Sequence, residues 1–262
     1  MRLPIYQVDA FADAVFAGNP AAVVPLEAWL PDATLLAIAA ENNLAETAFF
    51  VREGDGCELR WFTPAVEVDL CGHATLATAF VIATILEPGR EHFAFNTRQA
   101  GALTVARQGE RFVLDFPARP PAAVDPHPDL LPALGGPKPT AVLGGRDYLV
   151  VYDDATTVRE LKPDMARLAG LDRYAVSVTA PGEGGVDFVS RFFAPAQGIP
   201  EDPVTGSAHC TLIPYWAQRL GKTTLSARQV SARGGNLACE LAGDRVKIGG
   251  TAVLYLEGAI HV

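Results

Sequence analysis

The sequence contains one short pattern twice, and this repetition constrains the fold more than any other feature. The segment RWFTPA at 60–65 returns as RFFAPA at 191–196, an offset of 131 positions. GHA at 72–74 returns as GSA at 206–208, an offset of 134. Two aligned segments in a common order favour an internal duplication. Because two repeats are too few for a solenoid, we expect two similar lobes with a small-molecule cleft between them.

The two halves also predict a similar series of elements: strands, a mostly apolar helix, then further strands. The strand-like runs ETAFFVRE and CELRWFTP are separated by Gly-Asp-Gly, which is typical of a hairpin. Helical spacing predicts helices over 31–45, 74–86, 156–170 and 207–221.

A stretch dense in proline and glycine, residues 117–139, is the predicted linker between the lobes. The predicted division is therefore an N-terminal lobe over 1–118 and a C-terminal lobe over 119–249. The last strand-like segment, about 250–262, is expected to return to the N-terminal lobe and complete it.

Composition indicates a soluble, acidic, globular protein. Of the 262 residues 49% are hydrophobic and 19% are charged, and the net charge is −9 without any basic run. Such a surface repels phosphate backbones, so we expect no nucleic-acid partner. The four cysteines have no paired spacing, which favours reduced thiols and a cytoplasmic location.

Several other classes of function lack their usual sequence signals. The N-terminus shows no secretory pattern, and the longest helix-like apolar run, 13 residues, is too short to cross a bilayer. Cys71-x-His73 has no second Cys/His pair at zinc-like spacing, so no metal is expected. No glycine-rich phosphate loop follows a strand, so we expect no dinucleotide, no ATP and no other cofactor.

The two repeated motifs, CGHAT and TGSAH, each stand at the start of an apolar helix. Gly72 and Gly206 would let the backbone turn tightly there. The first turn of a helix carries unpaired N–H groups and a positive dipole end, which together bind anions. If both helix starts face one cleft, an acidic protein gains a site for a carboxylate. The alternative is that both motifs are ordinary caps of core helices.

Three residues near these motifs could move a proton. Glu46 lies at a helix-to-strand junction in apolar surroundings, and such surroundings in general raise the pKa of a carboxyl group towards the range useful for acid–base catalysis. Asp202, in PEDPVTG, precedes Ser207 by five residues and can share its loop. His73 could donate a hydrogen bond, act as an acid or serve as a ligand. Each has a simpler alternative: a surface glutamate, a turn-initiating aspartate and a satisfied helix-start histidine.

Cys71 is a conceivable nucleophile, because a helix N-terminus favours the thiolate. The second copy of the motif has Thr205 at the matching position. A mechanism that uses two thiols is therefore excluded.

The motifs VDAFADAVFAGNPAAVV, NNLAETAFF, DLCGHATLA and EDPVTGSAH, in this order, resemble the PhzF-like (phenazine biosynthesis) family, relatives of diaminopimelate epimerase. The resemblance implies an α+β fold of two pseudo-symmetric lobes, each a mixed barrel-like sheet around a central apolar helix. It also implies proton transfer without a cofactor in the cleft, and a homodimer.

The resemblance places the family's general acid/base glutamate on Glu46, with Asp202 and His73 as further catalytic positions. The candidate substrate-binding residues are Gly72, His73, Gly206, Ser207, Asn19, Cys71 and Thr205. Diaminopimelate epimerases have a cysteine before each central helix, whereas only the first is present here. This departure favours the isomerase branch over two-thiol epimerisation.

The sequence therefore predicts a cofactor-independent isomerase of a small, carboxylate-bearing, unsaturated acid, either cyclic or open-chain. Two alternatives stay open. One is a non-catalytic small-molecule binding protein that uses the same cleft. The other is a racemase or epimerase that uses Cys71 as a single thiol.

Overall fold

The computed structural model describes residues 1–262, which form two compact units. Unit 1 comprises Met1–Phe116 and Ile248–Val262, and unit 2 comprises Pro117–Lys247. The division expected from the sequence placed both boundaries slightly further along the chain. As expected, the last segment of the chain belongs to the N-terminal unit.

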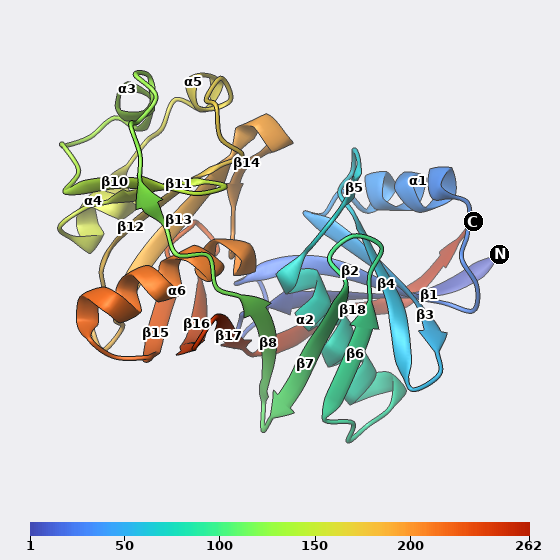
Figure 1. Ribbon diagram of the computed structural model, residues 1–262. Coiled ribbons are helices and arrows are strands. Elements are labelled where there is room, and N and C mark those ends of the chain that lie inside the picture. The colour runs from blue at the N-terminus through green and yellow to red at the C-terminus, as the bar shows by residue number, and fades with distance from the viewer. The chain divides into compact units, whose positions relative to one another are not determined.

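Unit 1 is built on one curved, mixed sheet with the strand order β18-β1-β2-β3-β4-β6-β7-β8. Neighbouring strands are antiparallel except for the parallel pairs β2–β3 and β4–β6. Figure 1 shows both chain ends side by side, where β1 and β18 pair. Its elements are β1 (Arg2–Ala10), β2 (Asn19–Leu26), α1 (Asp32–Asn42), β3 (Glu46–Glu53), β4 (Gly56–Phe62), β5 (Glu67–Val68), α2 (Gly72–Val81), a π-helical turn (Ile82–Leu86), β6 (His92–Asn96), β7 (Ala102–Gln108), β8 (Arg111–Pro117) and β18 (Ala252–His261).

Unit 2 repeats this plan with the strand order β9-β10-β11-β12-β13-β15-β16, in which β11–β12 and β13–β15 are the parallel pairs. Its elements are β9 (Ala122–Ala123), α3 (Leu130–Leu134), β10 (Ala141–Gly144), β11 (Tyr148–Val151), α4 (Ala155–Glu160), α5 (Met165–Leu168), β12 (Val176–Pro181), β13 (Phe188–Ala194), a 3₁₀ turn (Pro195–Gln197), β14 (Ile199–Asp202), α6 (Gly206–Leu220), β15 (Thr224–Gln229) and β16 (Gly235–Ala242). The next strand, β17 (Arg245–Gly250), begins in unit 2 and ends in unit 1.

The two units share one topology, as the repeated pattern predicts. The series β1 to β7 of unit 1 corresponds to β10 to β16 of unit 2, with α2 and α6 at the same place in each series. In each unit a helical crossover connects the two strands of the first parallel pair, and the central helix lies between the two strands of the second. The predicted fold class is confirmed.

Matching ion pairs explain why the pattern RWF/RFF recurs. Arg60 donates from Nε and Nη2 to the carboxylate of Glu67, each at 2.7 Å. Arg191 donates in the same way to Glu201, at 2.7 and 2.9 Å. A bidentate arginine–carboxylate pair fixes geometry as well as charge. The pair links β4 to β5 in unit 1 and β13 to β14 in unit 2, and in each unit the second of these strands leads into the central helix.

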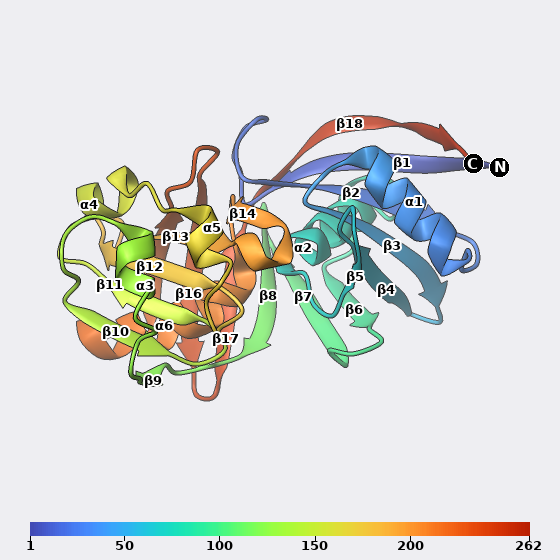
Figure 2. The same ribbon diagram turned by 90° about the horizontal axis from the view of Figure 1, so that it is seen from above.

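Each central helix is a buried core element. Nine of the ten residues of α2 are buried, and the helix packs on β1, β2 and β3 (Figure 2). Helix α6 packs on β15 and β16. On the other sheet faces, α1 covers an apolar cluster that includes Leu35 and Phe49, and α4 packs on β12 and β13. None of the helices combines the length and apolar character that a membrane span requires.

Two predicted elements differ from the structure. The helix expected over 156–170 is two short helices, α4 and α5, because Pro163 lacks the N–H that a continuous helix would need at that point. The expected linker 117–139 contains β9 and α3 and belongs to unit 2. Leu130 and Leu134 of α3 lie in the core of that unit.

Candidate active site

In unit 1 the candidate site begins where the chain enters α2. Cys71 is the N-cap residue in extended conformation, with φ −136° and ψ 106°. The amide and hydroxyl of Thr75 both donate to the carbonyl oxygen of Cys71, at 3.1 and 2.6 Å. No side chain caps the first-turn N–H groups, and the first turn holds no acidic residue. The start of α2 therefore presents uncovered backbone donors.

The two glycines of the repeated motifs lie inside the first turn of their helices. Neither Gly72 nor Gly206 has a positive φ, since both already lie within their helices. Glycine is therefore not required at these positions for a left-handed turn. What it provides is a helix start without a side chain over the neighbouring backbone N–H groups.

Glu46 is the first residue of β3 and lies beside this helix start. It follows α1, which ends at Asn43 in the left-handed conformation, with φ 48°. The Glu46 side chain is 11% exposed, and its Oε2 lies 3.1 Å from Nε2 of His73. This contact is an ion pair rather than a well-aligned hydrogen bond, and no other group donates to Oε2. A buried carboxylate oxygen with spare accepting capacity is suited to take up a proton.

His73 has a polar neighbour at each ring nitrogen. Its Nδ1 lies 3.1 Å from the side-chain amide of Asn19, at the start of β2, and 3.5 Å from Sγ of Cys71. Its Nε2 faces Glu46. A protonated ring donates from both nitrogens, so it requires the amide oxygen of Asn19 at Nδ1 and directs its Nε2–H toward the Glu46 carboxylate.

The charges of this cluster follow from burial and from its own members. Burial lowers the pKa of His73, but the Glu46 carboxylate beside Nε2 opposes this and raises it above the ordinary histidine value. We therefore expect an imidazolium beside the Glu46 carboxylate at neutral pH. Burial, with Glu46 adding to it, raises the pKa of the Cys71 thiol to about 11, against the opposing effect of His73. Cys71 is then a neutral thiol at neutral pH.

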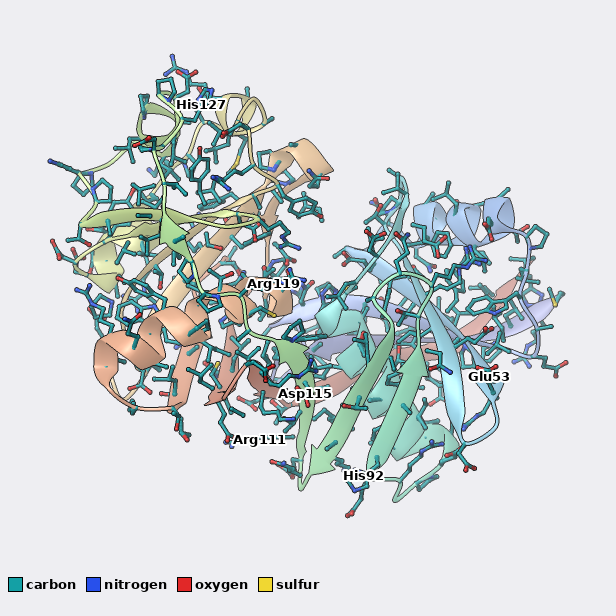
Figure 3. The ribbon with its side chains drawn as sticks, viewed as in Figure 1. Glu53, His92, Arg111, Asp115, Arg119 and His127 are labelled. Atoms are coloured by element: carbon teal, nitrogen blue, oxygen red, sulfur yellow. The ribbon has the colours of Figure 1, made fainter.

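The same three side chains are the group in this structure that could hold a metal ion. One ligand atom each from Glu46, Cys71 and His73 lies within 4.8 Å of the others. The chemistry of the donors fits a metal poorly, because a thiolate ligand must be deprotonated and this thiol has a raised pKa. His92, which is labelled in Figure 3, is a further histidine of unit 1 and is exposed at the start of β6.

In unit 2 the start of α6 has nearly the same backbone. Thr205 is the N-cap residue, with φ −114° and ψ 99°, and Gly206 and Ser207 open the helix. The hydroxyl of Thr205 donates to Oδ2 of Asp202, the last residue of β14, at 2.6 Å. The Asp202 side chain is buried. Asp202, Thr205 and Ser207 are thus brought together within one loop and helix start.

Two residues of this second group were not predicted from the sequence. Gln229, at the end of β15, is fully buried and bonds to both Asp202 and Thr205. Arg146, in the turn before β11, donates from Nη2 to Oγ of Ser207 at 3.2 Å while its guanidinium is paired with Asp147. Both lie 20 or more positions from the TGSAH motif, and no repeat or spacing marks them.

His209 is buried one turn into α6 but is not part of an acid–base pair. Its Nδ1 donates to the carbonyl oxygen of Thr205, at 2.8 Å. Burial lowers its pKa to about 4, with this hydrogen bond opposing the shift. His209 is therefore neutral at neutral pH and serves the packing of α6 against Phe188.

Comparison with known proteins gives consistent results across the whole chain. The profile of the family described as phenazine biosynthesis-like protein (PhzC-PhzF) matches residues 8–258. The chain is 56% identical to an uncharacterized isomerase of Pseudomonas aeruginosa, with 100% of both chains covered. A crystal structure of a PhzF-family phenazine biosynthesis protein of Enterococcus faecalis is 52% identical, with full coverage of both chains and a TM-score of 0.96.

A more distant neighbour shares the fold alone. A probable proline racemase of Agrobacterium radiobacter is 12% identical, with a TM-score of 0.61 over 99% of this chain and 92% of that one. The family resemblance of the four sequence motifs is confirmed, and the comparisons together support an isomerase in general.

Proposed function

Because the chain belongs to the phenazine biosynthesis-like PhzC-PhzF family, we propose that it is a cofactor-independent isomerase that relocates a proton on a small, unsaturated carboxylic acid. Glu46 is the general acid/base. The observation that carries this proposal is the buried Glu46 carboxylate, whose Oε2 has no hydrogen-bond donor and lies 3.1 Å from His73. A group of this kind can accept a proton without first losing a hydrogen bond.

The proposed reaction balances within the substrate and Glu46. The Glu46 carboxylate removes a proton from an sp³ carbon next to the unsaturated system. The electron pair of the broken C–H bond moves into that system and shifts the double bond. The resulting Glu46 carboxylic acid then returns the proton to a second carbon, which restores the carboxylate. No redox step occurs.

His73 supports this cycle through its charge. An imidazolium beside Glu46 stabilises the carboxylate before proton removal and after proton return. In the proposal it also donates to a hydroxyl or amino group of the substrate as negative charge develops there. Such stabilisation by a preorganised donor is usually a large part of the rate enhancement.

The remaining predicted residues bind the substrate in this proposal. The uncovered N–H groups at the starts of α2 and α6 suit a carboxylate. Ser207, with Arg146 donating to its hydroxyl, adds polar groups at the start of α6. Asp202 binds an amino or hydroxyl group of the substrate. Formation of a homodimer and the cytoplasmic location stay predictions of the sequence.

Deuterium incorporation tests the proposal. Small unsaturated carboxylates that contain an sp³ carbon, including dihydro-3-hydroxyanthranilate and its relatives, are screened for stabilisation of the protein against heat, since a ligand at ten times its Kd adds over ~1 kcal/mol. Ligands that stabilise the protein are then incubated with it in D₂O and followed by NMR. Deuterium at a carbon of the ligand, with a shifted double bond, supports the isomerase. Tight binding without deuterium incorporation contradicts it and favours the non-catalytic binding protein.

A single-thiol racemase or epimerase is less well supported. It requires a thiolate at Cys71, and the pKa of about 11 leaves very little thiolate at neutral pH.

A further inference from the structure

We propose that Gln229 is a positioning residue for catalysis, which acts through Thr205 on the carboxylate of Asp202. This inference rests on the proposed role of Asp202 in substrate binding. Gln229 ends β15, and its side chain is 0% exposed. Burial of a side-chain amide is costly unless its hydrogen bonds are made, and here both ends of the amide are engaged within one loop.

The amide makes three bonds, and all go to the segment that carries Asp202. Its Oε1 accepts from the backbone N–H of Thr205 at 2.8 Å. Its Nε2 donates to the backbone carbonyl of Asp202 at 2.7 Å and to Oγ1 of Thr205 at 3.1 Å. Gln229 therefore fixes the main chain at both ends of the loop between β14 and α6.

The third bond also sets the direction of a hydrogen-bond relay. An amide NH₂ can only donate, so Oγ1 of Thr205 accepts from Gln229. The hydroxyl proton of Thr205 is then left for Oδ2 of Asp202, and this bond is short, 2.6 Å. The relay runs from Gln229 through Thr205 to Asp202 and holds that carboxylate in one rotamer. Bonds to a charged acceptor are the stronger ones, so losing the relay should loosen Asp202.

Substitution of Gln229 by glutamate tests the donor role through pH. A carboxylate at this position cannot donate to the Asp202 carbonyl, and it lies near the Asp202 carboxylate. A protonated carboxyl group can accept from the Thr205 amide and can donate through its single O–H to either the Asp202 carbonyl or Oγ1 of Thr205, so it restores one of the two bonds that Gln229 donates. Burial and the nearby negative charge raise the pKa of the introduced group. Its functional, protonated form is therefore present at low pH and lost as pH rises through that raised pKa.

The expected result is a pH-dependent ratio. For Gln229→Glu, kcat/KM divided by the wild-type value should rise about tenfold or more between pH 8 and pH 5.5. For Gln229→Leu, kcat/KM should be about tenfold below the wild-type value at every pH in that range, so the ratio should be nearly constant. A Gln229→Glu ratio that does not change with pH overturns the donor role.

A double-mutant cycle with Asp202→Asn separates positioning from a general structural effect. If Gln229 acts through Asp202, the double variant Gln229→Leu/Asp202→Asn should be within about twofold of Asp202→Asn alone. If instead the loss of kcat/KM in the double variant equals the product of the losses in the two single variants, the inference is overturned. This comparison requires that the thermal midpoint of each variant lies well above the assay temperature.

A substrate-free measurement keeps this inference distinct from the proposed function. The backbone amide of Thr205 should be protected from hydrogen exchange in the wild type and in Gln229→Glu at pH 5.5, but not in Gln229→Leu. If the wild type turns over no carboxylate, the proposed function fails. The hydrogen-exchange measurement still shows whether Gln229 holds the Thr205 amide, because it needs no substrate. Equal protection in Gln229→Leu contradicts this contact.

Discussion

At the scale of single residues, protonation decides which side chain in the Glu46–Cys71–His73 cluster can act as the base. The Glu46 carboxylate and the His73 imidazolium stabilise one another, whereas the buried thiol stays neutral. Motif spacing placed Cys71 and His73 at one helix start, and the family resemblance added Glu46 as the general acid/base. The sequence could not show which of the three side chains acts as the base, because that depends on burial and on distances of 3–4 Å that exist only in the folded unit.

Replacement of Cys71 by serine tests this ranking. With its pKa at about 11, the thiol contributes no base at neutral pH, so Cys71→Ser should retain kcat within about threefold of the wild type. Proton exchange into the substrate in D₂O provides the measurement, with iodoacetamide-treated wild type for comparison. A loss of a hundredfold or more in Cys71→Ser would instead support the single-thiol mechanism.

His209 gives unit 2 a defined sensitivity to acid. Its pKa in the folded protein is about 4, below the ordinary value of 6.5, so the unfolded chain takes up the proton first as pH falls. The stability linked to neutral His209 is present above about pH 6.5 and is lost as pH falls through 4. Its size is about 3 kcal/mol, from 1.36 kcal/mol per pKa unit.

We therefore expect wild type to lose about 3 kcal/mol more stability than His209→Gln between pH 7.5 and pH 4. Urea unfolding at the two pH values measures the difference. Equal losses in the two proteins would show that His209 is not held neutral in the fold.

At the scale of elements, local patterns predicted most strands and the two central helices. They failed where one residue interrupts a pattern, as Pro163 does between α4 and α5, and where a proline-rich stretch is ordered by burial, as in α3. Gln229 illustrates a different limit. A polar residue at the end of a strand has no sequence signal, because its partners come from a loop 24–27 positions earlier.

The repeated arginine of unit 2, whose side chain is 11% exposed, provides a test at this scale. Arg191 pairs with Glu201 and also donates from Nη1 to the carbonyl oxygens of Val158 and Leu161, at 3.1 and 2.8 Å. Removing one partner of a buried pair leaves the others unsatisfied. Arg191→Met should therefore lower the free energy of unfolding by about 3 kcal/mol.

Arg159→Met is the matched control, since Arg159 pairs with Glu183 at the surface with both side chains more than 40% exposed. A surface pair of this kind contributes under ~1 kcal/mol. Denaturant unfolding of both variants measures the difference, and equal losses would contradict a structural role for the repeated arginine.

At the scale of the whole molecule, the repeated motifs and the common order of predicted elements indicate two units with the same topology. The repeat is visible in the sequence because each copy needs the same arginine, the same carboxylate and the same helix start. The chemistry has diverged between the copies. Unit 1 carries Cys71 and His73 where unit 2 carries Thr205 and Ser207.

The most direct test of the account compares two glutamates of the same strand. Glu46 opens β3 and is buried, whereas Glu53 closes it and is exposed, as Figure 3 shows. Deuterium incorporation into a turned-over carboxylate is measured in D₂O for the wild type, Glu46→Gln and Glu53→Gln. We predict that Glu53→Gln matches the wild type, while Glu46→Gln is slower by about a hundredfold or more and still binds the ligand. Incorporation by Glu46→Gln at the wild-type rate would contradict the proposal that Glu46 moves the proton.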